Sequence, residues 1–143
     1  MRNLLSIGLL FCFLLSFTAC NHNPGKADDV KVTIGESVDF SKDEIQKAVN
    51  AVTHKFRDFE DCELLSLWYD EKESDDDVQA YLLSGRGSVN GAKAENVIVL
   101  FSDFYAGENA EGGFNPDSDY EGWNWILIRD SKTSDWRVDD WGY

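Results

Sequence analysis

The chain has 143 residues, of which 43% are hydrophobic and 13% are aromatic. This composition supports one folded domain with its own core and argues against a disordered chain. Lysine and arginine number 13 against 27 aspartate and glutamate residues, which gives a formal net charge of −14. Nucleic acid is therefore not an expected partner, because its phosphates need a basic surface. Direct adhesion of this acidic surface to anionic lipid is disfavoured for the same reason.

The first 19 residues have the features of a secretion signal. Arg2 provides a positive start, and an apolar run from Leu4 to Phe17 follows it. That run is shorter than the ~20 residues that a membrane-spanning helix needs. The segment is therefore predicted to be a cleaved signal peptide and not a transmembrane helix.

The residues Phe17-Thr18-Ala19-Cys20 resemble the lipobox of bacterial lipoproteins, in which a large apolar residue and two small ones precede cysteine. The family usually has leucine where this chain has Phe17, but bulky Phe17 also disfavours an ordinary signal-peptidase cut after Ala19. The resemblance implies cleavage before Cys20, a diacylglyceryl thioether on its sulfur and usually a further N-acyl chain. Two or more acyl chains anchor a protein stably. We therefore expect the protein to bind the cell membrane through lipid on Cys20, at its extracytoplasmic face.

The other cysteines leave no internal disulfide in the mature domain. Cys12 lies in the leader, so Cys62 is the only remaining cysteine besides Cys20. No basic motif stands near Cys62 to activate it as a nucleophile. A small buried thiol is its expected role.

Three segments are predicted: a signal peptide at 1–19, the lipidated cysteine with a polar linker and arm at 20–39, and a single α+β domain at 40–143. A helix is expected from about 42 to 59, because Ser41 and Glu44 form a capping box ahead of an apolar stripe at helical spacing.

The segment after this helix combines a strand with a short helix. Residues 62–70 predict the strand, with Leu64 and Trp68 on one face and Leu65, Leu67 and Tyr69 on the other. Ser74 predicts the N-cap of the helix, which ends near residue 83.

The second half of the chain predicts three further strands at 96–105, 122–130 and 135–141. Asn90-Gly91 predicts a tight hairpin turn before the first of them. The expected fold is α+β: one long N-terminal helix and a short helix packed on a curved, mainly antiparallel, cone-like sheet.

Three blocks of sequence carry a family resemblance: residues 96–104, 123–130 and 136–143. They resemble small lipoproteins of Gram-positive bacteria, mostly Clostridia and relatives, that carry a domain of unknown function over about residues 40–143. The resemblance implies no activity. The order of elements is also similar to the nuclear transport factor 2-like cone, a likeness that implies a fold and not a function.

Aromatic residues and carboxylates provide candidates for a ligand pocket, which are Trp68, Asp103, Trp123, Trp125 and Asp139. A pocket lined by aromatic rings and carboxylates suits a sugar-like or cationic small molecule. An envelope protein is the alternative partner for this domain. The alternative is that most of the rings, including the further candidates Trp136 and Trp141, fill the core. The sequence does not indicate an oligomeric state.

One acidic stretch resembles part of a calcium loop. Asp117, Asp119 and Glu121 match its opening, but Ile128 stands where the bidentate glutamate belongs. A solvated acidic loop is the expected interpretation, so no metal or cofactor is predicted and calcium remains the alternative.

Catalysis finds little support in the sequence. His54 is the only histidine in the expected folded domain and points away from the apolar stripe, and no activated serine, cysteine or zinc pattern is present. The expected function is a non-catalytic binding or interaction domain on a lipid anchor. The alternative is a small hydrolase or isomerase in which Asp103 and Asp139 form a carboxylate pair inside the cone.

Overall fold

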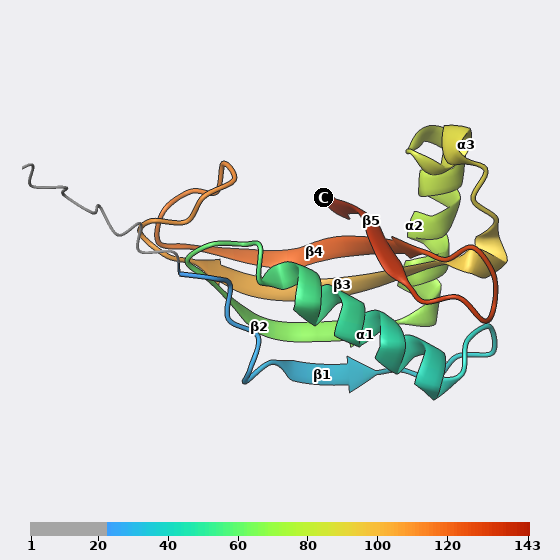
Figure 1. The fold of residues 1–143 in the computed structure, drawn as a ribbon, viewed down its shortest axis with the longest axis horizontal. Coiled ribbons are helices and arrows are strands. Elements are labelled where there is room, and N and C mark those ends of the chain that lie inside the picture. The colour runs from blue at the N-terminus through green and yellow to red at the C-terminus, as the bar shows by residue number, and fades with distance from the viewer. Residues whose placement is uncertain (1–22) are drawn as a thin grey trace, which may run out of the picture.

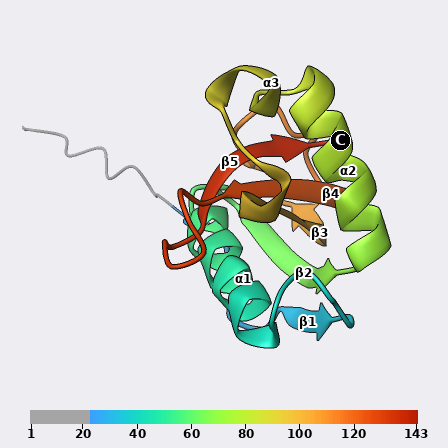
Figure 2. The same ribbon diagram turned by 90° about the vertical axis from the view of Figure 1, so that its right-hand side faces the viewer.

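The computed structural model describes residues 23–143, and the predicted signal peptide and Cys20 lie outside this range. The described part forms one five-stranded sheet in the order β1-β2-β3-β4-β5, with helices on its two faces (Figures 1 and 2). The strands are β1 (Lys31–Ile34), β2 (Cys62–Tyr69), β3 (Val97–Ala106), β4 (Ser118–Ile128) and β5 (Arg137–Gly142). The helices are α1 (Lys42–Phe56), α2 (Glu71–Ser84) and α3 (Gly87–Asn90), and a short 3-10 turn, η1 (Ala94–Asn96), precedes β3.

The α+β class predicted from the sequence is confirmed. Strands β2 to β5 pair antiparallel with their neighbours, and β1 pairs parallel with β2. Within residues 23–143, no helix is both long enough and apolar enough to span a bilayer.

Helix α1 forms because its first turn caps itself and its apolar stripe packs on the sheet. The Ser41 hydroxyl accepts a hydrogen bond from the Glu44 N–H, and the Glu44 carboxylate accepts one from the Ser41 N–H. The buried side of the helix ends at Phe56, which is 0% exposed. The helix therefore ends three residues before the predicted limit, although Phe59 still belongs to the core.

Two hydrophobic cores lie on the two faces of the sheet. The α1 face is filled by large side chains, among them Phe56, Phe104 and Trp125. The opposite face is covered by α2, whose Val78 and Tyr81 pack on strand residues that include Val99. Figure 2 shows α1 and α2 on opposite sides of the sheet. The fold is thus a helix–sheet–helix sandwich built on one sheet.

Strand β2 contains a bulge that sequence alternation does not reveal. The pairing register with β3 shifts between Leu64 and Ser66, which is the effect of one extra residue in a ladder. Leu64 and Leu67 are consequently both buried on the α1 face, whereas Leu65 is 44% exposed. The predicted grouping is therefore wrong: Leu64 shares a core with Leu67 and Tyr69, Trp68 lies on the other face, and Leu65 is exposed to solvent.

Two local predictions in the next segment are wrong. Asp70, not Ser74, caps α2 by accepting a hydrogen bond from the Glu73 N–H. Ser74 is 1% exposed, and its hydroxyl accepts the Val99 N–H of β3 at 3.0 Å. The Asn90-Gly91 pair does not form a hairpin turn, because Gly91 ends the short helix α3 with a left-handed φ of 77°.

Part of the segment predicted as linker and arm lies along the domain. Strand β1 forms one edge of the sheet, and Lys26 already makes an isolated bridge to Glu63 of β2. The other edge is β5, where the Asp139 carbonyl accepts a hydrogen bond from Arg86 and the Trp141 N–H donates to the Asp140 carboxylate. Both edges are therefore short strands: β5 carries Arg137, Asp139 and Asp140, and β1 has one charged residue, Lys31.

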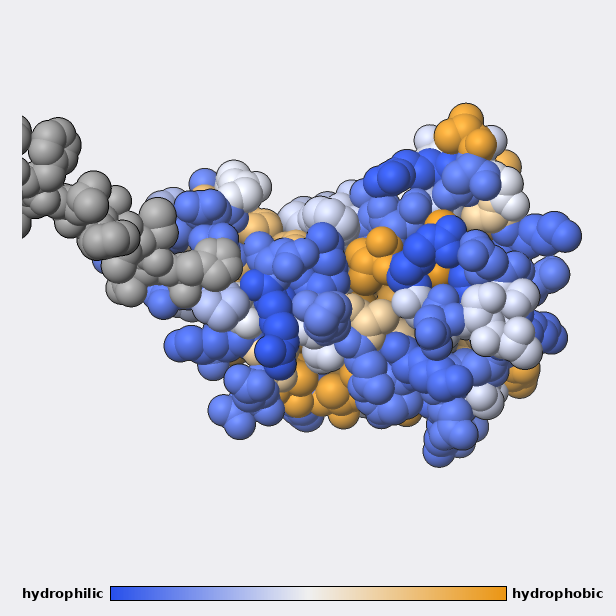
Figure 3. Space-filling model, in the orientation of Figure 1, coloured by the Kyte–Doolittle hydropathy of each residue, from blue (hydrophilic) through white to orange (hydrophobic). Residues whose placement is uncertain are grey.

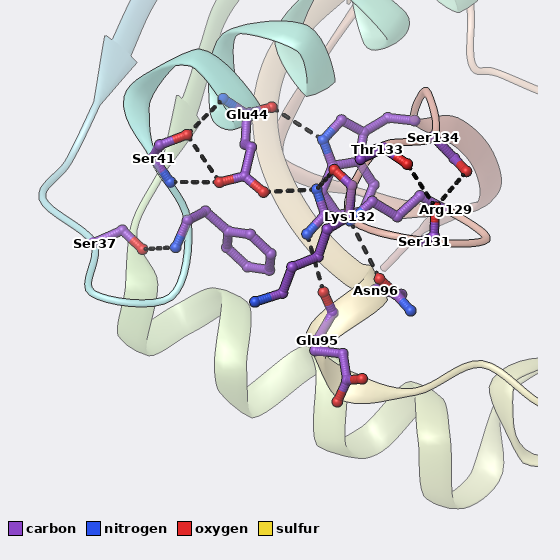
Figure 4. Close-up of polar contacts among 12 residues, drawn as sticks. Ser37, Ser41, Glu44, Glu95, Asn96, Arg129, Ser131, Lys132, Thr133 and Ser134 are labelled. Atoms are coloured by element: carbon purple, nitrogen blue, oxygen red, sulfur yellow. Dashed lines mark hydrogen bonds and ion pairs between the residues drawn. The ribbon is translucent and has the colours of Figure 1, made fainter.

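Arg129 joins the start of α1 to the link between β4 and β5 (Figure 4). Its side chain is 2% exposed and donates to Glu44 Oε1 at 2.7 Å. It also donates to Asn96 Oδ1 and to the Glu95 carbonyl. The guanidinium carbon lies 4.3 Å from the ring centroid of Trp136, a cation–π geometry. This buried cation thus holds three separate chain segments together.

The Glu44 carboxylate provides a pH-dependent contribution to stability. Hydrogen bonding from the Ser41 backbone and then from Arg129 lowers the pKa of Glu44 from 4.5 to about 2. A lowered pKa in the folded state stabilises the protein above the ordinary value, and this stabilisation is lost as pH falls from about 4.5 towards 2. At pH 6 we expect the free energy of unfolding of the wild type to exceed that of Glu44→Gln by about 2 kcal/mol. This figure is reduced for the 28% exposure of the Glu44 side chain. The difference should shrink by pH 3 in urea titrations of both proteins, and a constant difference would contradict the assignment.

Candidate functional site

The structure divides the tryptophans predicted to share a pocket between the two faces of the sheet. Trp125 is 0% exposed in the α1-side core, and its Nε1 donates to Ser102 Oγ at 2.9 Å. Trp123 packs on the same side, edge-on to Phe104. Trp68 lies on the α2 side, where it stacks on Phe101. Trp125 is therefore a core residue, and the three rings do not line one cavity.

The two carboxylates predicted to form a pair have separate partners. Asp103 accepts hydrogen bonds from Ser66 Oγ at 2.8 Å and from the Gly122 N–H at 2.9 Å. Asp139 accepts one from Tyr81 Oη at 2.7 Å and lies 3.5 Å from the Arg86 guanidinium. Each carboxylate thus fastens neighbouring elements together.

The sheet register also separates these carboxylates. Asp139 lies in the irregular step of the β4–β5 pairing, opposite Ile126 and Leu127. Those residues pair with Val99 and Ile98, which are four and five positions from Asp103 along β3. At about 3.3 Å per residue, the two levels are roughly 13–17 Å apart along the strand. A carboxylate pair of the kind used in acid–base catalysis is not formed by these two residues.

The acidic stretch that resembles a calcium loop is largely part of a strand. β4 starts at Ser118, four residues earlier than predicted, so Asp119 and Glu121 lie within the strand and not in a loop. Asp117 precedes the strand, and its carboxylate accepts a hydrogen bond from Tyr105 Oη at 2.8 Å. Across residues 23–143, no group of three or more His, Cys, Asp or Glu side chains is arranged to hold a metal ion.

Cys62 has the structural role expected for it. It is a free thiol, 2% exposed. Burial, together with the neighbouring Asp61 carboxylate, raises the pKa of the Cys62 thiol to about 11. The thiol is therefore protonated at neutral pH and is not a nucleophile.

A groove of about 580 Å³ lies between α1 and β5. Its lining residues are Lys47, Asn50, Ala51, His54, Lys55, Asp58, Asp135, Trp136, Arg137, Val138 and Trp141. One wall is the solvent-facing side of α1, and the other is the last strand together with the residues before it. Sequence distance explains why the groove was not predicted, because its walls lie about 80 residues apart in the chain.

Trp141 is the exposed aromatic ring in this groove. It is 41% exposed, and its ring is backed by Trp125 at 6.4 Å and Phe59 at 6.1 Å between centroids. Lys55 Nζ lies 4.8 Å from the Trp141 ring centroid and 2.9 Å from Asp58 Oδ2. The Trp141 ring is thus backed by the core and has the Lys55 ammonium over it, while part of the ring faces solvent.

A second hollow of about 330 Å³ continues the groove past Trp141. The two hollows share Lys55, Asp58 and Trp141. Phe59 and Phe114 line the second one, and Phe114 comes from the loop between β3 and β4. The result is an extended groove, which we call the α1–β5 groove, with aromatic rings along it.

Polar groups of both signs surround this groove. Lys47, Lys55 and Arg137 face Asp58 and Asp135 in the first hollow. The face on which α1 lies is otherwise mostly hydrophilic, with hydrophobic residues in small separate patches (Figure 3). An aromatic surface with donors and acceptors of both signs suits a ligand that has a flat apolar face and many hydroxyl or amide groups.

The fold and the groove together define a small α+β domain with an aromatic-lined groove on one face. The chain belongs to the family described as "Domain of unknown function (DUF4829)", which matches residues 26–142. The match begins at Lys26, the residue through which the chain first pairs with β2. No curated protein and no solved structure matches the chain.

Proposed function

We propose that this protein is a non-catalytic binding protein, held on the extracytoplasmic face of the cell membrane by lipid on Cys20. In this proposal the α1–β5 groove binds the ligand. The observation that carries it is Trp141, a tryptophan 41% exposed in a groove and supported from behind by Trp125 and Phe59. Partly exposed aromatic rings with a few polar groups beside them are typical of small-molecule sites.

The proposed ligand is sugar-like. A saccharide offers an apolar ring face to Trp141 and hydroxyl groups to Asn50, Asp58 and Arg137. A simple ion fits less well, because the cations and carboxylates around the groove partly neutralise one another, as in the Lys55–Asp58 and Arg137–Asp130 pairs. An extended ligand of several rings matches a groove that continues past Trp141 into a second hollow.

Finer assignments belong to the same proposal. The lipobox at residues 17–20 supports membership among small lipoproteins of Gram-positive bacteria. The packing of α1 against one face of a mainly antiparallel sheet supports a variant of the nuclear transport factor 2-like cone.

Replacement of Trp141 by alanine is expected to weaken saccharide binding by roughly 5- to 150-fold, since a well-placed aromatic contact contributes on the order of 1–3 kcal/mol. The measurement is calorimetric titration of the protein with soluble cell-wall glycan fragments of increasing length. Affinity should rise with length until the groove is filled.

The matched control for this experiment is Tyr143→Ala. Tyr143 is also a C-terminal aromatic residue and is 78% exposed, but it does not line either hollow of the groove. Its removal should leave binding unchanged. Equal affinities for wild type and Trp141→Ala, or equal losses in the two variants, would remove the groove as the binding site.

A further inference from the structure

Four backbone hydrogen bonds fix the start of the described chain to the domain. The Asn23 carbonyl accepts the Asp61 N–H at 2.8 Å, and the Gly25 N–H donates to the Arg57 carbonyl at 3.1 Å. Lys26 both donates to the Cys62 carbonyl and accepts from the Leu64 N–H. The segment predicted to be a free polar linker is therefore attached to the fold from Asn23 onward.

Gly25 shows that this attachment is specific. A Cβ atom at this position would lie 2.1 Å from the Phe56 carbonyl oxygen and 2.7 Å from that of Phe59. Only glycine allows the chain to pass so close to the end of α1. The residue is buried as a result. The contact is thus part of the packed fold and not a passing surface contact.

The distance between Cys20 and the fold is consequently short. Three residue steps separate Cys20 from Asn23 in the sequence. A fully extended chain covers at most about 3.5 Å per residue, so Asn23 lies within roughly 10 Å of the Cys20 backbone. A lipid on Cys20, as proposed above, keeps Asn23 within that distance of the bilayer surface.

The attachment also selects one end of the domain. The Asp61 carbonyl accepts the Gly107 N–H at 2.8 Å, and the Asp61 carboxylate accepts the Asn109 N–H at 2.9 Å. Asp61 therefore links the docked segment to the loop between β3 and β4. Figure 1 shows this loop and the start of the described chain at one end of the sheet, with α3 at the other.

We propose that the end formed by residues 23–26, Asp61 and the loop 107–117 is the membrane-facing end, held against the lipid headgroups in one orientation. This inference rests on the proposed lipid at Cys20. The headgroup surface is the partner, and the tether provides the attraction, because Glu108, Glu111 and Asp117 make this end acidic and would repel anionic lipid. Orientation therefore comes from the short tether and not from surface charge.

The orientation places the α1–β5 groove relative to the bilayer. Glu111, Gly112 and Phe114 of the loop 107–117 line one end of the groove, and Lys47 and Asp135 line the other. The groove thus begins near the membrane surface and extends away from it along α1. A ligand that rises from the membrane, or that lies close above it, meets the groove at this lower end.

Headgroup quenching in vesicles tests the orientation. The acylated full-length product is reconstituted into phosphatidylcholine vesicles that contain a lipid with a nitroxide on its headgroup. A fluorophore is attached either at Asn115→Cys, in the loop 107–117, or at Val89→Cys, in α3. Strand β3, with 10 residues, spans about 33 Å between these ends. The label at residue 115 is expected to be quenched several-fold more strongly than the label at residue 89.

A tether variant provides the matched control. Insertion of a flexible Gly-Ser segment of about ten residues between His22 and Asn23 leaves the docked residues intact but lengthens the tether. The difference in quenching between the two labels should largely disappear in this variant. Equal quenching of both labels without the insertion, or a difference that the insertion leaves unchanged, would overturn the inference.

Failure of the inference can be separated from failure of the proposed function. The mass of the N-terminal peptide shows directly whether Cys20 carries acyl chains. An unacylated cysteine removes the lipid anchor and, with it, the orientation. An acylated protein with equal quenching at both labels removes only the orientation.

Discussion

Replacement of Arg129 by methionine is expected to lower the free energy of unfolding by about 3–5 kcal/mol, the range for breaking a buried charge pair. Methionine fills much of the space but donates no hydrogen bond. Glu44 then loses its 2.7 Å partner, and the Glu95 carbonyl and the Asn96 amide lose theirs. The cation over the Trp136 ring is lost as well. Urea titration at neutral pH, followed by tryptophan fluorescence, measures the change.

The control for Arg129→Met is Arg137→Met. Arg137 pairs with Asp130 at 3.0 Å, but its side chain is 54% exposed and that of Asp130 is 79% exposed. Exposed pairs contribute about 0–1 kcal/mol, so this variant should unfold almost as the wild type does. A loss below 1 kcal/mol for Arg129→Met would show that the contacts of the buried guanidinium do not stabilise the fold as argued.

Replacement of Cys20 by alanine is expected to abolish the lipid anchor completely. Cys20 carries the only sulfur at the predicted cleavage site, and the acyl chains on it are the proposed source of membrane binding. The variant should either keep its leader or be released from the membrane. Mass spectrometry of the N-terminus distinguishes these results, because an uncleaved apolar leader would also remain with the membrane.

The control for Cys20→Ala is Cys12→Ala, which changes a cysteine inside the leader. It should leave cleavage and acylation at Cys20 unchanged. Normal processing of Cys20→Ala, with the acyl mass still present on the N-terminal peptide, would refute lipidation at this residue.

Local signals account for the elements that the sequence predicts well. The capping box of Ser41 and Glu44 is complete within four residues, so the start of α1 needs no tertiary information. The apolar run that became β3 is buried along most of its length, as expected for a central strand. Because such local patterns identify both helices and strands, the mixed α+β class was predictable as well.

Long-range contacts explain the predictions that fail. Ser74 has the residue type of an N-cap, but its hydroxyl accepts a hydrogen bond from the Val99 N–H of strand β3 instead. Asn90-Gly91 suits both a hairpin turn and a helix end, because both need a left-handed glycine. The bulge beside Leu65 depends on the pairing of β2 with β3 and leaves no local signature.

The α1–β5 groove illustrates the same limit. Alternation correctly groups Trp123 with Trp125 on one face of β4, but it does not show how much of that face the helix covers. Trp125 is sealed beneath α1, whereas Trp141, its pairing partner on β5, remains partly open. The position of Trp141 among the charged residues of the last strand could have indicated an exposed ring, since a strand at the edge of a sheet is covered on fewer sides.

The two sheet edges have a consequence for crowding. On the lipid anchor proposed above, copies of the domain would diffuse in two dimensions and would meet far more often than in free solution. An open strand would let one copy extend the sheet of the next and start a filament. In β5 the Arg86–Asp139 and Asp140–Trp141 hydrogen bonds already occupy backbone groups, and β1 offers only four residues. Copies of the domain on such an anchor should therefore not extend one another's sheet through β1 or β5.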